Sequence, residues 1–299
     1  MQTEGPEGPL VVIGIQDALQ ALVTGLAMGS LYGLLGLGFV LLYKGTRVVN
    51  FAQGEAVMVG GYAAWVFYVA WALPYPVVLV LVLLSGTTLG LLMDQVLRKL
   101  RQAPELTTVM ATLAIAIALK GVARLIAGDM PLMFRQPFPG DPLMLDRVAI
   151  PWHSMWILAM FLCVVTVGYL IYYKTKAGLG MRAMAQSRQA AQLMGVSLPW
   201  VFATTWALAS AVGALVGLLF APSWNVDPYM SLGLLLMSFS AAVLGGFGSL
   251  PGVMIGGWLI AIGENMLGLF FGSTIKDFVP FATIFLVLTI KPTGLLKGD

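Results

Sequence analysis

The stretch Ala21–Arg47 reads ALVTGLAMGSLYGLLGLGFVLLYKGTR and decides the fold. Its first 23 residues, as far as Tyr43, carry no charge, and the basic residues Lys44 and Arg47 close it. About 20 apolar residues in a helix are enough to cross the hydrocarbon core of a bilayer. The stretch therefore predicts a membrane-spanning helix that ends at a basic boundary, which is typical of the cytoplasmic side.

The rest of the chain has the same character. Of its 299 residues, 59% are apolar and 10% are charged, and the mean hydropathy is +0.92. Soluble domains carry about 25% charged residues and disordered chains have low hydrophobicity, so this composition excludes both classes. The net charge of +3 comes from short basic clusters, which argues against a nucleic-acid surface. We expect an all-α, polytopic transmembrane helical bundle.

Charged residues, prolines and glycines divide the chain into apolar runs of helical length. We expect nine spans, or eight if one of the short runs is re-entrant. The runs cover residues 17–43, 48–71, 77–97, 106–127, 154–173, 200–221, 232–244, 253–271 and 278–290.

Basic residues predict the orientation, because cytoplasmic loops of membrane proteins are enriched in Lys and Arg. The positive-inside rule favours an N-terminus outside and a C-terminus in the cytoplasm, since the outer side then keeps only Arg135, Arg147 and Lys276. The cytoplasmic side holds Lys44, Arg47, Arg98, Lys99, Arg101, Lys174, Lys176, Arg182, Arg188, Lys291 and Lys297.

The chain divides into three parts. Residues 1–16 form an acidic N-terminal extension without Lys or Arg, so we do not expect a cleavable secretory signal. Residues 17–291 form the transmembrane domain, which includes a charged cytoplasmic loop at 174–199. Residues 292–299 form a cytoplasmic tail.

Glycines recur at four-residue spacing within the apolar runs. Such small-residue seams let helix backbones approach closely in lipid, where no hydrophobic force drives helices together. Two interpretations stay open, plain bundle packing and gating movements along the seams. The glycines concerned are Gly25, Gly29, Gly33, Gly213, Gly217, Gly252 and Gly256.

The cytoplasmic loop predicts a short helix that lies at the membrane surface. Spacings of three and four residues place one set of side chains on a single face, and Gly195 and Pro199 are expected to end the helix. A rigid helix here could transmit force from a soluble partner, or it could be an amphipathic linker lying on lipid. The face consists of Arg182, Ala183, Gln186, Ala190 and Leu193.

Four blocks of sequence carry a resemblance to a known family. They are VNFAQGEAVMVGGY (49–62), GLGMRAMAQSRQAAQLMGV (178–196), VLGGFGSLPGVMIGG (243–257) and KPTGLL (291–296). In this order they resemble permease subunits of the high-affinity branched-chain amino acid ABC transporter family. Two features depart from the family pattern. Gln53 stands where the family usually has His, which bears on the substrate, and the loop 128–153 and the N-terminal extension match nothing in the family.

The resemblance implies a partner list and a site for ATPase coupling. The partners would be a second permease subunit, as a homodimer or heterodimer, two cytoplasmic ATPase subunits and an external solute-binding protein, at the inner membrane of a bacterial or archaeal cell. The chain has no G-x-x-x-x-G-K-[ST] phosphate loop, so ATP hydrolysis is expected on the separate subunits and not here. No cofactor is implied. The coupling residues would be Gly180, Arg182, Ala190, Ala191, Gly195 and Pro199.

Polar residues inside the apolar runs suggest a substrate pathway. Asn50 is three residues before Gln53, as in a capping box, so a helix starting at Asn50 would offer free N–H groups to a substrate carboxylate near Gly54 and Glu55. The alternative is that this helix starts at the water interface and Glu55 is solvated. Glu264 and its neighbour Asn265, midway along the run 253–271, complete the pathway candidates.

An ion pair is predicted between Lys120 and Glu264. Counting about 1.5 Å per residue puts both at a similar depth below the outer boundary. A charge inside the membrane is costly unless it is paired or hydrated. The alternative is that Lys120 and Arg124 extend outward separately to the interface.

Other function classes have weaker support. Cys163 and His153 are the only residues of their types, so neither a disulfide framework nor a metal site is expected. An ion-coupled secondary transporter would explain Glu55 and Glu264 but not the coupling loop. An intramembrane serine protease is suggested only by Gly248-Ser249. The solute stays open, since relatives of branched-chain amino acid permeases that carry amides, urea or other amino acids are plausible.

Overall fold

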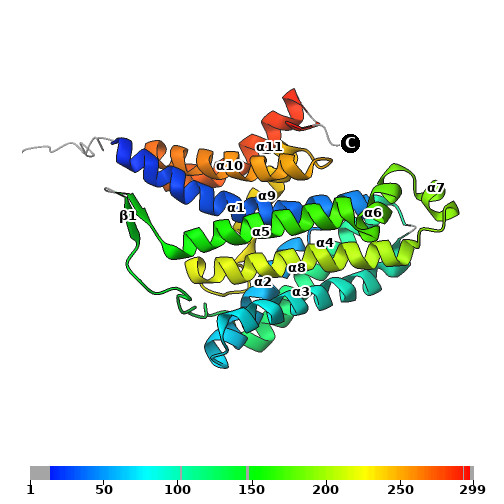
Figure 1. Ribbon diagram of the computed structural model, residues 1–299, viewed down its shortest axis with the longest axis horizontal. Coiled ribbons are helices and arrows are strands. Elements are labelled where there is room, and N and C mark those ends of the chain that lie inside the picture. The colour runs from blue at the N-terminus through cyan, green and yellow to red at the C-terminus, as the bar shows by residue number, and fades with distance from the viewer. Residues whose placement is uncertain (1–13, 102, 146–147, 292, 297–299) are drawn as a thin grey trace, which may run out of the picture.

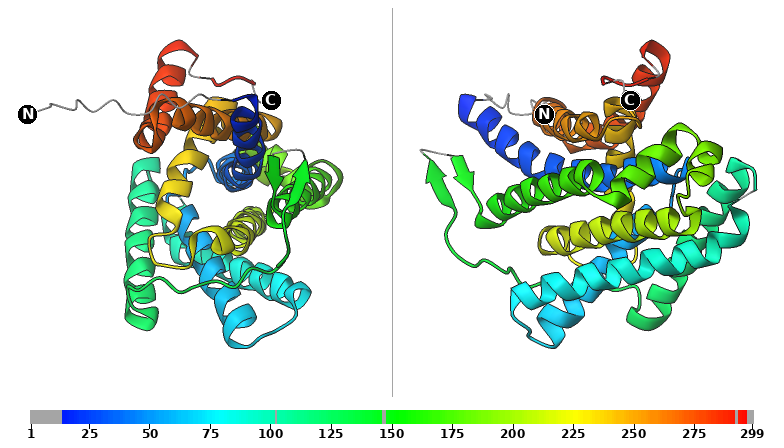
Figure 2. Two further views of the ribbon diagram at one scale, coloured as in Figure 1. Left: turned by 90° about the vertical axis from the view of Figure 1, so that its left-hand side faces the viewer. Right: turned by 45° about the vertical axis from the view of Figure 1, so that its right-hand side comes forward.

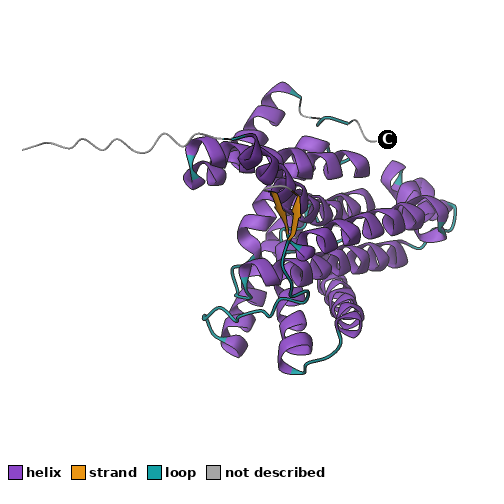
Figure 3. Cartoon of the chain, turned by 60° about the vertical axis from the view of Figure 1, so that its left-hand side comes forward, coloured by secondary structure: helices purple, strands orange, loops and turns teal. Residues whose placement is uncertain are grey.

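The computed structural model describes residues 14–101, 103–145, 148–291 and 293–296. Most of the acidic extension, Arg147, Lys297 and half of the tail thus lie outside the described residues. The described chain is mainly helical, with two short strands (Figure 3), and these strands stand at one end of the molecule (Figure 1). The helices α6 and α7 lie at the opposite end (Figure 1).

Six helices in the described part of the chain are long and apolar enough to cross a membrane. They are α1 (Ile15–Thr46), α3 (Tyr75–Leu97, continued by a 3₁₀ turn Arg98–Leu100), α4 (Glu105–Ala127), α5 (Trp152–Lys174), α8 (Leu198–Trp224) and α10 (Leu250–Phe271). The expected all-α membrane bundle is thus confirmed, while the count of eight or nine spans stays a prediction.

Three further apolar segments are shorter. They are α2 (Gln53–Ala64, continued by a π-helical turn Trp65–Ala70), α9 (Ser231–Gly245) and α11 (Val279–Ile290, preceded by a 3₁₀ turn Ser273–Phe278). Each of these helices coincides with a predicted apolar run to within a few residues, so the nine runs all correspond to helical segments.

Burial divides the helices into an inner and an outer set. In the most apolar stretch of α1, 89% of the residues are buried, and α8 is similarly enclosed, whereas α4 and α5 are only 11% buried. Accordingly, α4 runs along the outside of the bundle (Figure 2, left). The exposed faces of the outer helices are apolar, as expected for surfaces that face lipid.

The glycine seams are packing surfaces. A Cβ built on Gly29 of α1 would lie 2.7 Å from the Cα of Trp258 in α10, and one built on Gly217 of α8 would lie 2.1 Å from the backbone oxygen of Val57 in α2. These distances leave no room for a side chain, so the helix backbones are in direct contact there.

The second helix starts later than predicted. Arg47 ends α1 in the left-handed conformation, and residues 48–52 are not helical, so α2 begins at Gln53 and not at Asn50. The reason is local, because the Asn50 side chain accepts a hydrogen bond from the backbone N–H of Ala52 and forms a turn.

The loop 174–199, which we expect on the cytoplasmic side, contains two helices and not one. Ser187 is extended and separates α6 (Lys176–Gln186) from α7 (Arg188–Leu193), with its hydroxyl capping α7 through the N–H of Ala190. The predicted single face from Arg182 to Leu193 is therefore wrong, because its residues lie on two separate helices. The predicted stop is confirmed, because Gly195 follows the helix with φ of +83°.

The loop after α4 carries a β-hairpin of β1 (Leu143–Leu145) and β2 (Val148–Ile150). The Gln20 side chain of α1 both donates to and accepts from the backbone of Ala149, at 3.0 and 2.9 Å. The hairpin therefore lies beside the N-terminal end of α1, a link that the loop sequence did not predict.

We predict that Gly29→Ala destabilises the bundle by about 1–3 kcal/mol, because the new methyl group must push α1 away from the backbone of Trp258. Thermal unfolding of the purified protein in nanodiscs measures the effect. Gly263→Ala on α10 is the matched control, since nothing lies within 4 Å of its Cβ position and alanine favours a helix. Equal unfolding temperatures for the two variants would contradict the packing role of the seam.

Candidate functional site

The start of α2 carries a buried polar group. Asn50, Gln53 and Glu55 are each at most 1% exposed. The Gln53 amide donates to the backbone oxygen of Ala209 in α8 at 2.8 Å and lies 3.5 Å from the Asn50 side chain. Asn50 and Gln53 are thus brought together inside the bundle, where polar groups require partners, whereas Glu55 is buried with a separate partner.

The backbone N–H groups at the start of α2 are already hydrogen-bonded. Phe51 donates to the Thr112 hydroxyl at 3.2 Å, Ala52 to the Asn50 side chain at 2.9 Å, and Glu55 to the backbone oxygen of Ala52 at 3.1 Å. Most of the backbone N–H groups that were expected to be free for a substrate carboxylate therefore already donate hydrogen bonds within the protein. The alternative of a solvated Glu55 is also wrong, because its side chain is buried.

Lys120 pairs with Glu55 and not with Glu264. Its Nζ lies 3.2 Å from Glu55 Oε1, and the two side chains are 22% and 1% exposed. Glu264 instead accepts a hydrogen bond from the Tyr32 hydroxyl at 2.8 Å. The predicted pair is wrong because α4 packs against α2, whereas α10 packs against α1 and α9.

Glu264 and Asn265 belong to a separate polar group. Asn265 donates to the backbone oxygen of Ala261, and its side-chain oxygen lies 3.4 Å from Lys276 Nζ. These contacts, with Tyr32, involve α1, α10 and the turn after α10, and none of the described contacts joins them to Glu55. Their place in a substrate pathway stays a prediction.

Arg124 does not share the surroundings of Lys120. It forms an exposed ion pair with Asp129, just beyond the end of α4, with N–O distances of 2.5 and 2.8 Å. The hydrogen bond from the Arg124 guanidinium lowers the pKa of the Asp129 carboxyl below its ordinary value. The alternative prediction was that Lys120 and Arg124 both extend outward to the interface. The structure agrees with it for Arg124 and not for Lys120.

Sequence reasoning missed a serine beside the α2 start. A Cβ built on Gly54 would lie 3.4 Å from the Ser231 hydroxyl of α9, and that hydroxyl is buried without a hydrogen-bond partner in the described structure. A serine at the beginning of the apolar run 232–244 was the available signal. Because Gly54 has no side chain, α9 can pack close to α2 at this point.

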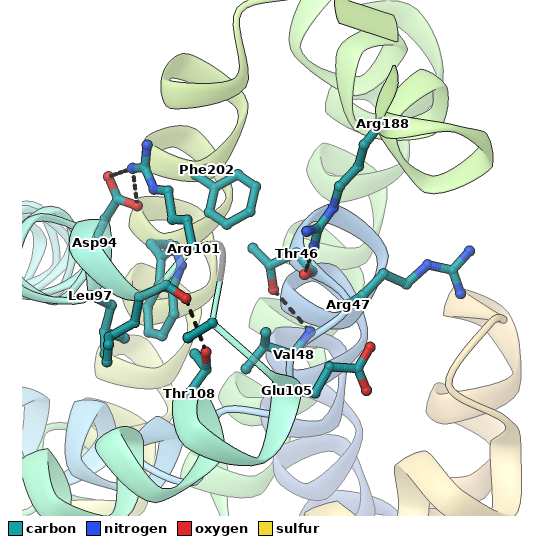
Figure 4. Close-up of a pocket in the computed structure, with 13 residues that line it drawn as sticks. Thr46, Arg47, Val48, Asp94, Leu97, Arg101, Glu105, Thr108, Arg188 and Phe202 are labelled. Carbon is teal, nitrogen blue, oxygen red and sulfur yellow. Dashed lines mark hydrogen bonds and ion pairs between the residues drawn. The ribbon is translucent and has the colours of Figure 1, made fainter. Parts of the chain in front are cut away.

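A second polar site lies at the end of the bundle that carries α6 and α7. A cavity of about 150 Å³ lies there, and in it Arg101 forms a two-pronged ion pair with Asp94 at 2.6 and 2.7 Å. Figure 4 shows the residues that line it. Arg101 and Arg188 lie 4.9 and 5.6 Å from the ring centre of Phe202. The aromatic ring and the carboxylate together hold two cations in a confined space.

Two crossed arginine bonds join the α6–α7 loop to the end of α1. Arg188 of α7 donates to the backbone oxygen of Thr46, and Arg47 donates to the backbone oxygen of Ala185 in α6 at 2.6 Å. Figure 4 shows Arg188 reaching from its helix towards Thr46. The loop is thus attached to the most buried helix of the bundle at two points.

The coupling residues implied by the resemblance divide into two groups. Gly180 and Ala191 are buried in the loop's own packing, and Arg182 lies over the rings of Tyr172 and Tyr173. Ala190, Gly195 and Pro199 are exposed.

The resemblance missed the most exposed apolar side chains of this loop. Leu193 and Met194 are 88% and 85% exposed, directly before Gly195. Two adjacent apolar residues directly before the glycine that ends the helix were the signal available in the sequence. Exposed apolar side chains of this kind suit a contact with another protein or with lipid.

Comparison with known proteins identifies the family of the chain. The model of the family described as branched-chain amino acid transport system / permease component matches residues 21–288. The chain belongs to this family. It is therefore a membrane-spanning permease component, and ATP hydrolysis resides on a separate subunit.

Curated relatives match almost the whole chain. The permease protein LivH of the high-affinity branched-chain amino acid transport system of Salmonella typhimurium is 28% identical over 93% of this chain and 95% of its own. BraD of Pseudomonas aeruginosa is 27% identical over 94% and 96%, and the probable permease protein LivH of Methanocaldococcus jannaschii is 29% identical over 90% of both. Among solved structures, PsaBC from Streptococcus pneumoniae in complex with Fab has a TM-score of 0.48 at 14% identity over 92% of each chain.

The other function classes lose their support. Ser249, the serine of the protease alternative, caps the start of α10 by accepting from the N–H of Gly252 at 3.1 Å. His153 bonds to the backbone oxygen of Leu219. Among the described residues, no three His, Cys, Asp or Glu side chains are grouped for a metal ion. Family membership also disfavours the secondary transporter.

We predict that Lys120→Met lowers the free energy of unfolding by about 2–3 kcal/mol, because it leaves the Glu55 carboxylate buried and unpaired. Adding Glu55→Gln to this variant should recover most of the loss, since the unpaired charge is gone. Thermal unfolding in nanodiscs provides the measurement. Arg124→Met, which breaks an exposed pair one helical turn away, should leave the unfolding temperature almost unchanged. A double variant as unstable as Lys120→Met alone would count against the pairing.

Proposed function

We propose that this chain is one of two membrane subunits of an ATP-driven importer for branched-chain or closely related amino acids. The observation that carries the proposal is the α6–α7 loop, with its exposed Leu193 and Met194 and its two arginine bonds to α1. Its curated relatives are named as permeases for such amino acids. The partners are a second permease, two cytoplasmic ATPase subunits and an external solute-binding protein.

Transport follows alternating access in this proposal. ATP binding moves the ATPase subunits, which push on α6 and α7, and the arginine bonds pass this displacement to α1. The loop 174–199 is the coupling segment of a permease domain that covers residues 17–291. The pathway for the solute includes Asn50, Gly54 and Glu55, with Glu264 and Asn265 at a second polar position.

The chain crosses the bacterial or archaeal inner membrane nine times, with its N-terminus outside and the tail 292–299 in the cytoplasm. The side-chain link between Gln20 and Ala149 supports this, because it joins the N-terminal end of α1 to the hairpin opposite α6 and α7. Near the other terminus, Leu295 donates to the backbone oxygen of Leu244. In the turn that follows Leu244, the ring of Phe247 packs on the ring of Tyr43, which lies at the α6–α7 end of α1. The tail is therefore near the end of the bundle that carries α6 and α7.

The energy source has a direct test. We expect the complete importer in proteoliposomes to accumulate leucine only with ATP inside the vesicles on the ATPase side. An ionophore that dissipates ion gradients should leave uptake unchanged, because hydrolysis supplies the free energy, and vanadate should stop it. Uptake that collapses with the gradient and persists without ATP would overturn the proposal in favour of an ion-coupled transporter.

We predict that Leu193→Asp with Met194→Asp reduces ATP-driven uptake about tenfold or more, because a charged pair replaces an apolar contact at the tip of the loop. The ATPase subunits should no longer co-purify with the permease. Met144→Asp in the hairpin is the matched control, since it changes an exposed apolar residue at the opposite end. Retention of ATPase by the double variant would show that this tip is not the coupling contact.

A further inference from the structure

An apolar cavity of about 630 Å³ separates α2 from the outer half of α4. Its size and lining match those of small-molecule sites, which are typically about 300–1,000 Å³ and mostly apolar with a few polar groups. Its lining includes Met58, Val59, Tyr62, Leu119 and Ala123.

The Glu55–Lys120 ion pair does not line this cavity but lies next to its lining residues along both helices. Met58 and Val59 follow Glu55 by three and four residues, so they share its face of α2 one helical turn further along. In α4, Ala123 follows Lys120 by three residues in the same way. A charged pair and an apolar cavity are therefore adjacent along one seam between two helices, roughly 5 Å apart along each axis.

Two buried polar atoms at this seam have unused bonding capacity. Lys120 contacts Glu55 Oε1, while Oε2 and the Tyr62 hydroxyl have no hydrogen-bond partner among the described residues. Lys120 keeps 22% of its side chain exposed and is therefore reachable. Buried polar atoms without partners need an explanation, and a visiting ligand is one.

We propose that this seam is a transient binding site for the zwitterion of an aliphatic α-amino acid, an inference that rests on the proposed function. Glu55 accepts hydrogen bonds from the ammonium group, Lys120 donates to the carboxylate, and the aliphatic side chain enters the cavity.

Charge balance explains why both residues are present. In the empty state Glu55 and Lys120 neutralise each other, so neither charge is left unpaired inside the membrane. A zwitterion brings one charge of each sign. The Glu55–Lys120 pair is then replaced by two ion pairs, one between Glu55 and the ammonium group and one between Lys120 and the carboxylate. No net charge is added at any stage.

The same argument gives specificity. An amide, urea or a simple amine lacks the carboxylate and would leave Lys120 without a partner once its bond to Glu55 opens. A site that holds both charges therefore rejects these solutes, because unpaired buried charges are costly. The apolar cavity favours side chains such as those of leucine, isoleucine and valine over that of glycine.

A photoreactive leucine, with a diazirine in its side chain, tests the site in the complete importer in proteoliposomes. Illumination during ATP-driven uptake should label peptides containing Met58–Tyr62 or Leu119–Ala123, as identified by mass spectrometry. Excess leucine should suppress the labelling, and leucinamide should not. Lys120→Met should reduce labelling about tenfold or more through loss of a charge-assisted bond, whereas Arg124→Met should not.

Ala123→Phe tests the cavity without touching the ion pair. It should fill the space and block both labelling and uptake at an unchanged unfolding temperature, which separates ligand binding from a structural role of Lys120. Labelling elsewhere, or labelling that leucine cannot displace because lipid occupies the cavity, would overturn the site while wild-type uptake continues. A wild-type importer that assembles but takes up no leucine would instead overturn the proposed function.

Discussion

The carboxylate of Glu55 imposes the central constraint on this bundle. A charged group enclosed by apolar helices needs a cation close by, because the bilayer core offers no water to solvate it. Lys120 supplies that cation from α4, the helix with the least buried surface together with α5. Among the described residues, a second polar contact joins α4 to the α2 region, the bond from the backbone N–H of Phe51 to the Thr112 hydroxyl. Helix α4 is thus held at the edge of the bundle by polar links as well as by the apolar packing around Ala116.

The opposite constraint holds for the inner helices. Between α1 and α10, and between α8 and α2, glycines bring the backbones into contact, and any added side chain would separate them. Close backbone packing makes these pairs rigid, since their geometry cannot adjust by changing rotamers. The inner helices can therefore transmit displacement, while α4 is attached by bonds that can exchange partners. The rigid backbone contacts thus belong to the inner helices, and the polar bonds that can exchange partners belong to α4.

Local boundary signals in the sequence predicted the long helices well. Helix α4 begins and ends within one residue of its predicted limits, because Pro104 and Gly128 mark both ends. The partner of Lys120 could not be predicted in this way. Depth along a helix follows from counting residues, but the direction in which a side chain points around the bundle follows from which helices pack together. Lys120 and Glu264 matched in depth and lay on different helix pairs. The break at Ser187 was missed for another reason, since a serine can cap a new helix as readily as it can sit within one.

The segment 47–52 connects the two polar sites. It begins at Arg47, whose guanidinium is bonded to the backbone of Ala185, and it reaches the start of α2 at Ala52. At its far end Phe51 is bonded to Thr112 of α4 and Ala52 to Asn50. The segment is thus bonded to α6 at its start and to α4 near its end. A displacement of α6 and α7 that moves Arg47 therefore has a route to the start of α2 through this backbone as well as through α1.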